Sequence, residues 1–472
     1  MRITISNKIL IEDISEELKI FLISLFKVPN SKFYEAKKAG RSIFGINKFI
    51  YNFSIIDDTT ILIPRGYRKQ LLNLELVKNE KNLKIIDKRS KFDKIEIDSS
   101  SIKYRKYQYD AVFSLFLNEE EGILVAPAGS GKTIIGLSLI PLFGQPTLWL
   151  THTKPLAKQV FERVQTFLPT LKNDDVRFIM GGKWKEGKIL TIALVQTLVR
   201  NIEKLKAIKN NFGLVIVDEC HHSPSTTFTN ILIELNPYYL FGLTATPYRK
   251  DKMENIMFQI IGPANILIPT DSVESSKNII KPKIKYRTIV SKHVHDNNVQ
   301  RLMKHHIIDN KKRNHIIVGD VIAEAVKNNF CLVASDRKIH CEILYNLISI
   351  GWEKTGIATG NYKDKHVQEQ VEKFNNKEIT VLITTYSLLG EGFDIPFLNR
   401  AFITTPFRNK VRTIQLIGRV QRSYPGKKDA VVFDYVDINI GVFKNQFFSK
   451  SENDSRYKTY ESLGLLIEPY QQ

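Results

Sequence analysis

Residues 122–139 read Gly-Ile-Leu-Val-Ala-Pro-Ala-Gly-Ser-Gly-Lys-Thr-Ile-Ile-Gly-Leu-Ser-Leu, and this stretch decides the fold. The apolar run at 122–125 predicts a buried strand, and the run that begins at residue 134 predicts a helix. Between them, the small residues of 126–133 let successive backbone N–H groups converge on an anion at the helix N-terminus, where the helix dipole adds positive potential. The order strand, loop, helix therefore predicts a phosphate-binding loop.

The polar residues of this loop have expected roles. Lys132 is predicted to reach the β- and γ-phosphates, and the Thr133 hydroxyl is predicted to hold Mg²⁺. The loop backbone would cradle the phosphates through Gly129, Ser130 and Gly131. The full pattern has glycine at position 126, where this chain has alanine. A small side chain suffices there unless φ must be positive. The competing interpretation is a glycine-rich turn without a ligand.

Composition narrows the class of protein. A chain of 472 residues is too long for one hydrophobic core and predicts about three domains. Its 69 Lys and Arg against 49 Asp and Glu give a net charge of +20, which favours a polyanionic partner, although a basic chain can also simply be soluble. The cysteines are far apart, so they indicate neither a zinc site nor a disulfide scaffold and favour a reducing, cytoplasmic compartment. The sequence shows no signal peptide, and no window approaches the roughly 18 apolar residues of a membrane span.

Short apolar runs that alternate with helical patterns recur in two series along the chain. Continuous apolar strands separated by helices predict a parallel sheet covered on both faces. We therefore predict an α/β fold with two tandem parallel-sheet domains, at 99–262 and at 310–472, the second ending in a helical tail. Prolines and a polar run suggest that 263–309 is a linker and connecting segment. Residues 1–98 predict a small α+β accessory domain.

An acidic pair follows one of the predicted strands. The apolar run at 214–217 is followed by Asp218-Glu219-Cys220-His221, at the carboxyl end of a strand, where α/β sheets place their ligands. Asp218 is predicted to hold Mg²⁺, and Glu219 is predicted to orient or deprotonate the attacking water. Alone, such a pair equally fits a solvated turn, but its place after a phosphate-binding loop favours catalysis.

Two further segments belong to the expected nucleotide site. Gln108 precedes a helical pattern, and its amide offers a donor and an acceptor that match the N6 and N7 edge of adenine. The nucleotide would then be ATP. Thr244-Ala245-Thr246 follows another strand, and the hydroxyls of Thr244 and Thr246 are candidates for coupling the ATP site to the neighbouring domain. Ordinary turn capping by threonine is the alternative.

Basic residues gather in the second α/β domain. Residues 390–394 read Gly-Glu-Gly-Phe-Asp, and residues 415–422 read Gln-Leu-Ile-Gly-Arg-Val-Gln-Arg. On a helix, Gln415, Arg419 and Arg422 share one face, because positions three and four apart are neighbours. If this face meets the phosphate-binding loop across a cleft, the arginines would neutralise charge that develops on the γ-phosphate. A solvated basic helix is the competing interpretation.

In this order, the motifs resemble those of superfamily 2 helicases, which have two RecA-like motor domains. The motifs are Arg105…Gln108, residues 126–133, Asp218 to His221, Thr244-Ala245-Thr246, Gly392…Asp394 and Gln415-x-x-Gly418-Arg419-x-x-Arg422. The resemblance covers about residues 100–437. It implies an ATP-hydrolysing enzyme that uses Mg²⁺. It also implies nucleotide-binding roles for Arg105, Gln108, Gly392, Asp394 and Gln415.

Within the superfamily, the chain resembles the XPB-like branch and the UvsW-like phage branch-migration helicases. This narrower resemblance depends on the small N-terminal domain, on Asp434-Tyr435-Val436-Asp437 after the last motif, and on Arg249-Lys250-Asp251 after the threonine motif. XPB-like proteins carry Arg-Glu-Asp at the last of these places. Because Lys250 reverses the charge, an XPB-specific role of this element does not carry over.

By the same resemblance, backbone-binding segments of both motor domains would contact DNA or RNA. Hydroxyls, backbone amides and single cations suit phosphate contacts, which position a strand without reading its sequence. The candidate residues are His152, Lys154, Gly182, Lys183, Gln196, Thr197, Ser335, Arg337, Thr384 and Thr385. Each of them alone also fits an ordinary loop.

The N-terminal domain contains a further basic segment. Its cations are interleaved with aromatic residues, in the set Lys37, Lys38, Arg41, Phe33, Tyr34 and Phe44. This segment fits a duplex-binding patch, and it fits equally a solvated helix face over aromatic core residues.

We therefore expect a monomeric, cytoplasmic, ATP-dependent DNA helicase or translocase of a prokaryotic or phage-infected cell. It would unwind or remodel forked and branched DNA in replication, recombination or repair. One alternative is an ATP-driven translocating subunit of a nuclease or restriction complex. The other is an RNA-directed helicase or a nucleic-acid sensor whose ATPase only gates binding.

Overall fold

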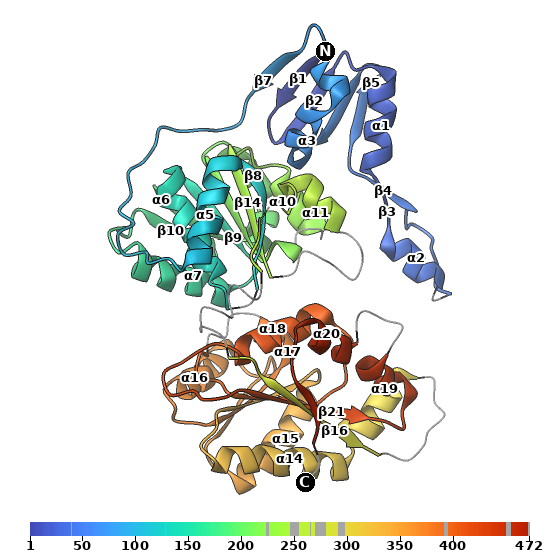
Figure 1. The fold of residues 1–472 in the computed structure, drawn as a ribbon, viewed down its shortest axis with the longest axis vertical. Helices are drawn as coiled ribbons and strands as arrows, with labels where there is room; N and C mark the ends of the chain where they lie inside the picture. The colour runs from blue at the N-terminus through green and yellow to red at the C-terminus, as the bar shows by residue number, and fades with distance from the viewer. Residues whose placement is uncertain are drawn as a thin grey trace. The chain divides into compact units, whose positions relative to one another are not determined.

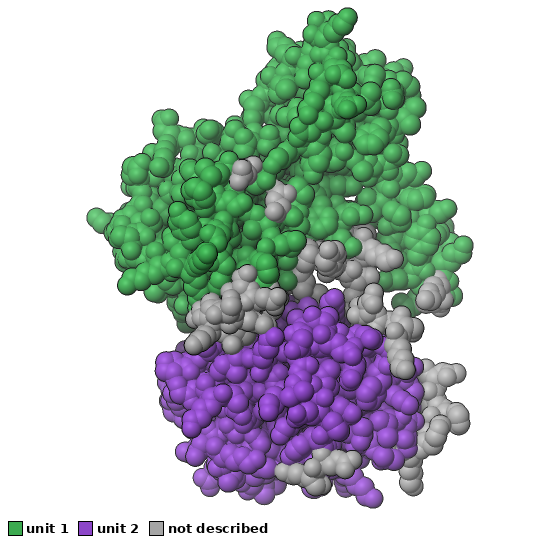
Figure 2. Space-filling view, in the orientation of Figure 1, with its two compact units in different colours: residues 1–272 green, residues 273–472 purple. Residues whose placement is uncertain are grey.

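The chain forms two compact units, Met1–Ser272 and Val273–Gln472, which are described separately below (Figure 2). This computed structural model describes the whole chain except residues 39, 128, 223–225, 246–253, 265, 270–279, 291–297, 391–394, 450–454 and 471–472. Among the described residues, no helix combines the length and the apolar character that a membrane crossing requires.

The first unit begins with a five-stranded sheet in the order β5-β6-β2-β1-β7 (Figure 1). The strands are β1 (Arg2–Ile5), β2 (Lys8–Glu12), β5 (Ser54–Asp57), β6 (Thr60–Pro64) and β7 (Lys84–Asp87). Alternate residues of β1 and β2 are buried, as expected for strands with one face on a core. Helix α1 (Glu16–Phe26) buries Leu18, Leu22 and Phe26, which are four residues apart and therefore share a face.

An eight-stranded sheet follows in the same unit, in the order β11-β10-β12-β9-β13-β14-β8-β15. All of its pairings are parallel except that of β10 with β11. The strands are β8 (Glu121–Val125), β9 (Thr147–Thr151), β10 (Val176–Met180), β11 (Lys183–Trp184), β12 (Leu190–Leu194), β13 (Leu214–Asp218), β14 (Tyr239–Thr244) and β15 (Ile266–Leu267). Because β13, β14 and β8 are neighbours and parallel, their carboxyl ends meet at one edge.

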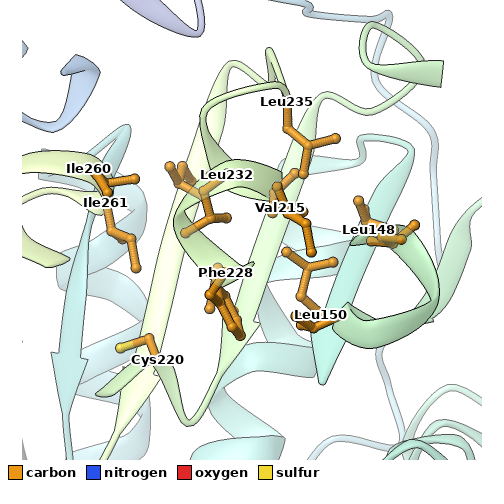
Figure 3. Packing of buried hydrophobic residues seen from close by; sticks show 14 of the residues in the cluster. Leu148, Leu150, Val215, Cys220, Phe228, Leu232, Leu235, Ile260 and Ile261 are labelled. Carbon is orange, nitrogen blue, oxygen red and sulfur yellow. The ribbon is translucent and has the colours of Figure 1, made fainter. Parts of the chain in front are cut away.

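Helices cover both faces of this sheet, which explains why its central strands are apolar throughout. On one face lie α5 (Lys106–Asn118), α6 (Lys132–Phe143) and α7 (Lys154–Phe167). On the other lie α8 (Val195–Val199), α10 (Thr226–Leu232) and α11 (Glu254–Ile261). Figure 3 shows Phe228 and Leu232 of α10 beside Leu148, Leu150 and Val215 of the strands, within one buried cluster.

Buried contacts join the N-terminal sheet to the eight-stranded sheet. The Arg65 guanidinium lies 3.2 Å from a carboxylate oxygen of Glu121, and each side chain is 2% exposed. Arg65 also donates to the Pro237 carbonyl oxygen at 2.6 Å. The Gly66 backbone approaches α11 so closely that a Cβ would stand 2.5 Å from the backbone nitrogen of Gly262. The N-terminal domain is therefore part of the first compact unit and not a tethered module.

The second unit contains a seven-stranded, fully parallel sheet in the order β18-β19-β17-β20-β21-β16-β22. The strands are β16 (Lys283–Ile289), β17 (Cys331–Ser335), β18 (Thr355–Ala358), β19 (Val381–Thr385), β20 (Arg400–Ile403), β21 (Val431–Asp437) and β22 (Ile467–Pro469). One face packs against α14 (Lys311–Val326) and α15 (Lys338–Gly351). The other packs against α16 (Asp364–Asn375), α18 (Lys410–Val420), α19 (Gly441–Phe448) and α20 (Arg456–Ser462).

The prediction of an α/β chain with two parallel-sheet domains is confirmed. Two details differ from the expected organisation. The segment 263–309, expected to connect the domains, contains β16, which pairs with β21 and therefore belongs to the second sheet. The expected helical tail ends in β22, which pairs with β16 at the sheet edge. Both strands escape periodicity arguments because their pairing partners are far away in the sequence.

Candidate functional site

The phosphate-binding loop lies at the carboxyl edge of the eight-stranded sheet, directly after β8. Gly129 and Gly131 have φ of +84° and +81°, a left-handed conformation that favours glycine and turns the loop into the start of α6. Ala126 is fully buried and its φ is not positive. Its N–H donates to the Thr244 carbonyl oxygen of β14 at 2.9 Å. Alanine at position 126 is therefore compatible with the loop.

Helix α5 holds this loop in place. The Gln108 amide nitrogen donates to the Ser130 carbonyl oxygen at 2.8 Å, and the amide oxygen accepts from the Arg105 N–H at 3.0 Å. The Tyr107 hydroxyl donates to the same Ser130 oxygen at 3.1 Å. A Cβ on Gly131 would stand 2.4 Å from the Gln108 amide nitrogen. Gln108 thus binds the loop backbone, a contact that sequence reasoning missed, and its adenine contact stays a prediction.

The acidic pair lies beside the loop lysine. The Lys132 ammonium is 3.9 Å from a carboxylate oxygen of Glu219 and donates to the Ala126 carbonyl oxygen at 3.4 Å. Glu219 has a φ of +48°, which is strained for a residue with a side chain and is typical of functional sites. Its N–H donates to an Asp218 carboxylate oxygen at 3.0 Å. Burial, and then the charge of Glu219, raise the pKa of Asp218 to about 7.

A buried histidine links the acidic pair to the threonine motif. His221 Nδ1 lies 3.1 Å from the Thr244 hydroxyl and 3.3 Å from a Glu219 carboxylate oxygen. The ends of β13 and β14 are therefore connected through side chains. Sequence reasoning assigned no role to His221 and therefore missed this contact. The other threonine of the motif, Thr246, lies outside the described residues.

His152, expected to contact nucleic acid, lies next to the acidic pair. Its Nε2 is 3.5 Å from the Glu219 carbonyl oxygen, and its ring is 5.0 Å from that of Phe228. Burial lowers the pKa of His152 to about 4, so the ring is neutral at physiological pH. A neutral ring contributes no cation to a phosphate contact, and its role stays a prediction.

The residues at this edge fit a magnesium nucleotide. Ser130 is fully buried, and its hydroxyl has no hydrogen-bond partner among the described residues. The hydroxyl can therefore form a hydrogen bond with a bound ligand. The two left-handed glycines orient loop amides as an anion-binding concavity requires. No cluster of three or more His, Cys, Asp or Glu that could hold a metal occurs in the described part of the chain. A carboxylate, a hydroxyl and substrate phosphates suit Mg²⁺ without such a cluster, and Asp218 and Thr133 supply the first two.

The expected nucleic-acid contacts in the first unit are largely at the surface. Lys154 is exposed at the start of α7, and Lys183 is exposed in β11. Gly182, just before Lys183, has a φ of +81°. Gln196 is exposed and Thr197 is half-buried at the start of α8. These residues remain candidates for phosphate contacts.

In the second unit, burial removes several expected contacts from the surface. Ser335 is fully buried, with its hydroxyl 3.1 Å from His340 Nδ1. Thr384 is fully buried, and Thr385 is buried with its hydroxyl 3.0 Å from that of Ser387. The end of a central parallel strand is covered from both faces, which the sequence pattern does not reveal. Arg337 is half-buried and donates to the Gln300 side chain at 2.7 Å.

The expected arginine face is only partly helical. Gln415 and Arg419 lie in α18, but the helix ends at Val420 and Gln421 caps it, so Arg422 follows the helix. The three residues therefore do not share one helix face as expected. No glycine follows Val420 directly, so the sequence does not indicate that the helix ends there. Gly392 and Asp394 lie outside the described residues.

Comparison with known proteins identifies two matching families. Residues 101–249 match the family described as "Type III restriction enzyme, res subunit", and residues 313–424 match the "Helicase conserved C-terminal domain" family. The "DNA 3'-5' translocase XPB2" of Sulfurisphaera tokodaii is 27% identical over 412 residues, covering 79% of this chain and 88% of that protein. The "ATP-dependent DNA helicase uvsW" of Enterobacteria phage T4 is 23% identical over 389 residues, covering 79% and 75%.

An RNA-directed relative is also similar. The "Putative ATP-dependent RNA helicase L396" of Acanthamoeba polyphaga mimivirus is 27% identical over 344 residues, which cover 71% of this chain. The match spans 63% of the mimivirus protein, so about a third of that protein has no counterpart in the alignment.

Proposed function

We propose that this chain, which belongs to the superfamily 2 helicases in the XPB-like and UvsW-like group, uses ATP hydrolysis to move along DNA and to remodel forked or branched DNA. The observation that carries the proposal is the position of Lys132 beside Glu219, at an edge where three parallel strands end. A hydrolytic site needs such a cation and such a carboxylate around a phosphate.

The residues at this edge have distinct proposed roles. Lys132 neutralises the terminal phosphates, and Glu219 orients the attacking water and receives its proton. Asp218 and Thr133 hold Mg²⁺, which when bound supplies positive charge to the phosphate oxygens. The contact of His221 with both Glu219 and Thr244 supports a coupling role for the threonine motif.

The second unit is proposed to supply cations for the γ-phosphate, from Arg419 and Arg422. The order of the motifs supports this role, and the substitution Arg422→Ala tests it. We expect the rate of ATP hydrolysis to fall about 10³-fold or more, with little change in nucleotide affinity, because such an arginine acts on charge that develops in the transition state. Equal losses of rate and affinity would assign Arg422 a binding or structural role instead.

DNA is the proposed track, supported by the DNA helicase and translocase relatives and by the net charge of +20. The experiment compares ATPase stimulation by single-stranded DNA, duplex DNA, junction DNA and RNA at one fixed salt concentration, because phosphate-dominated binding falls steeply with salt. Strand displacement is then measured on a fork, a four-way junction and a blunt duplex. Unwinding of the fork or junction is the expected result, and stimulation by RNA alone would overturn the DNA assignment.

A second function has one specific observation in its favour. The family that matches residues 101–249 takes its description from a restriction enzyme subunit, which suits a translocating motor that serves a nuclease. ATP hydrolysis on duplex DNA without strand displacement would favour this second function over the helicase.

A further inference from the structure

An arm extends from the N-terminal domain between α1 and β5. It comprises residues 27–51 and contains β3 (Lys27–Pro29), α2 (Ser31–Lys38) and β4 (Phe49–Tyr51) (Figure 1). The two strands pair antiparallel and form the base of the arm, whereas α2 and the loop that follows it form the outer part. The nucleotide site described above does not include this arm.

The base of the arm is fixed to the first parallel-sheet domain. Val28 is 4% exposed and joins the buried cluster that contains residues of α11, and Ile50 packs against the same cluster. Just after the arm, the Asn52 amide donates to the Gln259 side chain of α11 at 2.8 Å. Because these contacts reach the domain that holds the phosphate-binding loop, a ligand on the arm is held at a fixed position relative to that domain.

The arm carries a strong positive charge. It contains six Lys and Arg and one acidic residue, Glu35. The cations are Lys27, Lys32, Lys37, Lys38, Arg41 and Lys48. Such density of cations in a 25-residue segment needs an anionic partner or solvent around it, and it suits a phosphate backbone.

Aromatic side chains accompany these cations. Phe44 is 96% exposed, in a loop where Gly40 and Gly45 have left-handed backbone conformations, and Tyr51 is 56% exposed. At the base, an open groove of about 510 Å³ is lined by residues that include Lys32, Asn47, Phe49 and Tyr51. At 96% exposure the Phe44 side chain contributes almost nothing to a core, and its ring is open to a ligand that stacks on it.

We infer that the arm is a nucleic-acid-binding element whose Phe44 stacks on a base at the boundary between duplex and single strand. Bases offer π-faces to aromatic side chains whatever the sequence, and neighbouring cations hold the backbone. Aromatic and aliphatic residues inserted between base steps unstack them, which is the action a fork-remodelling motor needs. This inference depends on the proposed function only for its biological use, because binding by the arm needs no ATP.

The test measures binding of the full chain to a fork, a single strand and a blunt duplex without nucleotide, by fluorescence anisotropy at one salt concentration. Phe44→Ala is expected to weaken fork and single-strand binding about tenfold and blunt-duplex binding less. Phe113→Ala is the matched control, because Phe113 is an exposed aromatic residue of the same unit outside the arm. Phe44→Trp is expected to restore fork binding.

Several outcomes would overturn the inference. Unchanged fork binding by Phe44→Ala would remove the stacking role, and equal losses for Phe113→Ala would show that the effect is not specific. Retained nucleic-acid binding with loss of a protein partner would make the arm a protein-docking surface. Fork binding that depends on Phe44 in a chain that shows no DNA-stimulated ATPase would refute the proposed function and leave the arm assignment standing.

A separate observation concerns the end of α18. The Lys427 ammonium donates to the carbonyl oxygens of Val420 at 2.5 Å, of Arg422 at 2.7 Å and of Pro396 at 3.4 Å. An ammonium has three donors, and three carbonyl groups accept them here. The last carbonyl of a helix also carries partial negative charge that a cation stabilises.

We propose that Lys427 is a positioning residue that fixes the turn carrying Arg422. The charged groups facing it are Arg422, Arg400 and Asp429. Burial, and then the charges of the two arginines, lower the pKa of Lys427 to about 7, so its charge is partly lost within the physiological range. The ordering of the arginine turn then depends on pH.

The test compares Lys427→Met and Lys427→Arg, with Lys428→Met as an exposed control. We expect Lys427→Met to lower kcat for ATP about tenfold with little change in KM. We also expect faster amide hydrogen exchange in residues 418–424. Lys427→Arg keeps its charge and is expected to remove a decline of kcat between pH 7 and 9. Unchanged exchange would refute the positioning role, whereas faster exchange with unchanged kcat would refute the proposed catalytic role of Arg422.

Discussion

Buried carboxylates near the carboxyl edges of the two parallel sheets have different partners. In the second parallel sheet, β21 ends with Asp437, and Asp434 of the same strand pairs with Ile403, the last residue of β20. Each carboxylate lies against a buried arginine: Asp434 is 2.7 Å from Arg456, and Asp437 is 3.1 Å from Arg313. In the first sheet, β13 ends with Asp218, which is buried next to the carboxylate of Glu219. The carboxylates of the second parallel sheet are neutralised by arginines, whereas Asp218 and Glu219 lie side by side, with Lys132 3.9 Å from Glu219.

This difference distinguishes carboxylates that stabilise the fold from carboxylates that bind a ligand. A buried ion pair with good geometry satisfies both charges, so removing one partner is costly but the pair needs nothing else. Two adjacent carboxylates in a buried place repel each other and favour a bound cation. Substitutions in the ion pairs of the second parallel sheet are therefore expected to lower the free energy of unfolding. Substitution of Asp218 is expected to raise the free energy of unfolding and to abolish activity.

The largest effect should follow from removing the lysine of the first edge. Lys132→Ala is expected to lower DNA-stimulated ATP hydrolysis by about 10³-fold, because it removes the cation that faces the phosphates, while DNA binding persists. Release of phosphate and DNA anisotropy measure the two effects. Lys158→Ala, on the exposed surface of α7, is the control and should keep normal activity. Normal hydrolysis by Lys132→Ala would show that the loop assignment is wrong.

Breaking a neutralised pair of the second edge should affect stability first. Arg313→Leu leaves Asp437 buried without its partner and is expected to destabilise the second unit by about 3–5 kcal/mol. Thermal unfolding followed by calorimetry would show an earlier transition. Lys458→Ala, which breaks an exposed pair with Glu461, should shift that transition hardly at all. Similar shifts for both variants would remove the distinction between the two edges.

Neutralising Asp218, at the carboxyl edge of the first parallel sheet, should raise the free energy of unfolding. The folded-state pKa of Asp218, about 7, lies above the usual value near 3.9, so this group favours folding most below about pH 4 and loses that contribution as pH rises to about 7. Asp218→Asn does not titrate. In the nucleotide-free protein at pH 8 it is expected to be more stable than the wild type by on the order of 2 kcal/mol, with ATPase lost.

The pH dependence provides the control for this variant. The difference in unfolding free energy between Asp218→Asn and the wild type should shrink as pH falls from about 7 toward 4, because the folded-state carboxyl is then protonated and the unfolded-state carboxyl becomes increasingly so. A difference that does not vary with pH would show that Asp218 is not the titrating group.

The smallest effect concerns a hydroxyl of the second edge. Thr384 is fully buried, and its hydroxyl has no partner among the described residues. Thr384→Val is expected to be neutral or to stabilise the second unit by about 1 kcal/mol, because it removes a buried polar group. Affinity for DNA should not change. A clear loss of DNA affinity would show that Thr384 contacts nucleic acid and that its hydroxyl becomes accessible in solution.

Sequence reasoning located the parts of the nucleotide site well, because each part follows a short apolar strand. The sequence pattern predicts that the loop, the acidic pair and the threonine motif each lie at a strand end. The structure brings these ends together at one edge, with the loop after β8, Asp218 at the end of β13 and Thr244 at the end of β14. The contacts of Gln108 with Ser130 and of His221 with Thr244 were not foreseen. The first joins a side chain to the loop backbone 22 residues away, and the second joins two side chains 23 residues apart. No local sequence pattern encodes such contacts.

The sequence by itself determined the two parallel-sheet domains, the phosphate-binding loop and the chemical identity of the residues around it. Apolar periodicity and small-residue loops are local properties of the chain, so they can be read without knowing its partners. Only the tertiary structure decided which carboxylates are neutralised, which hydroxyls are buried and how the basic arm is anchored on α11. These properties depend on strand order and on contacts between distant segments, and they set the local dielectric and the charge that each side chain experiences.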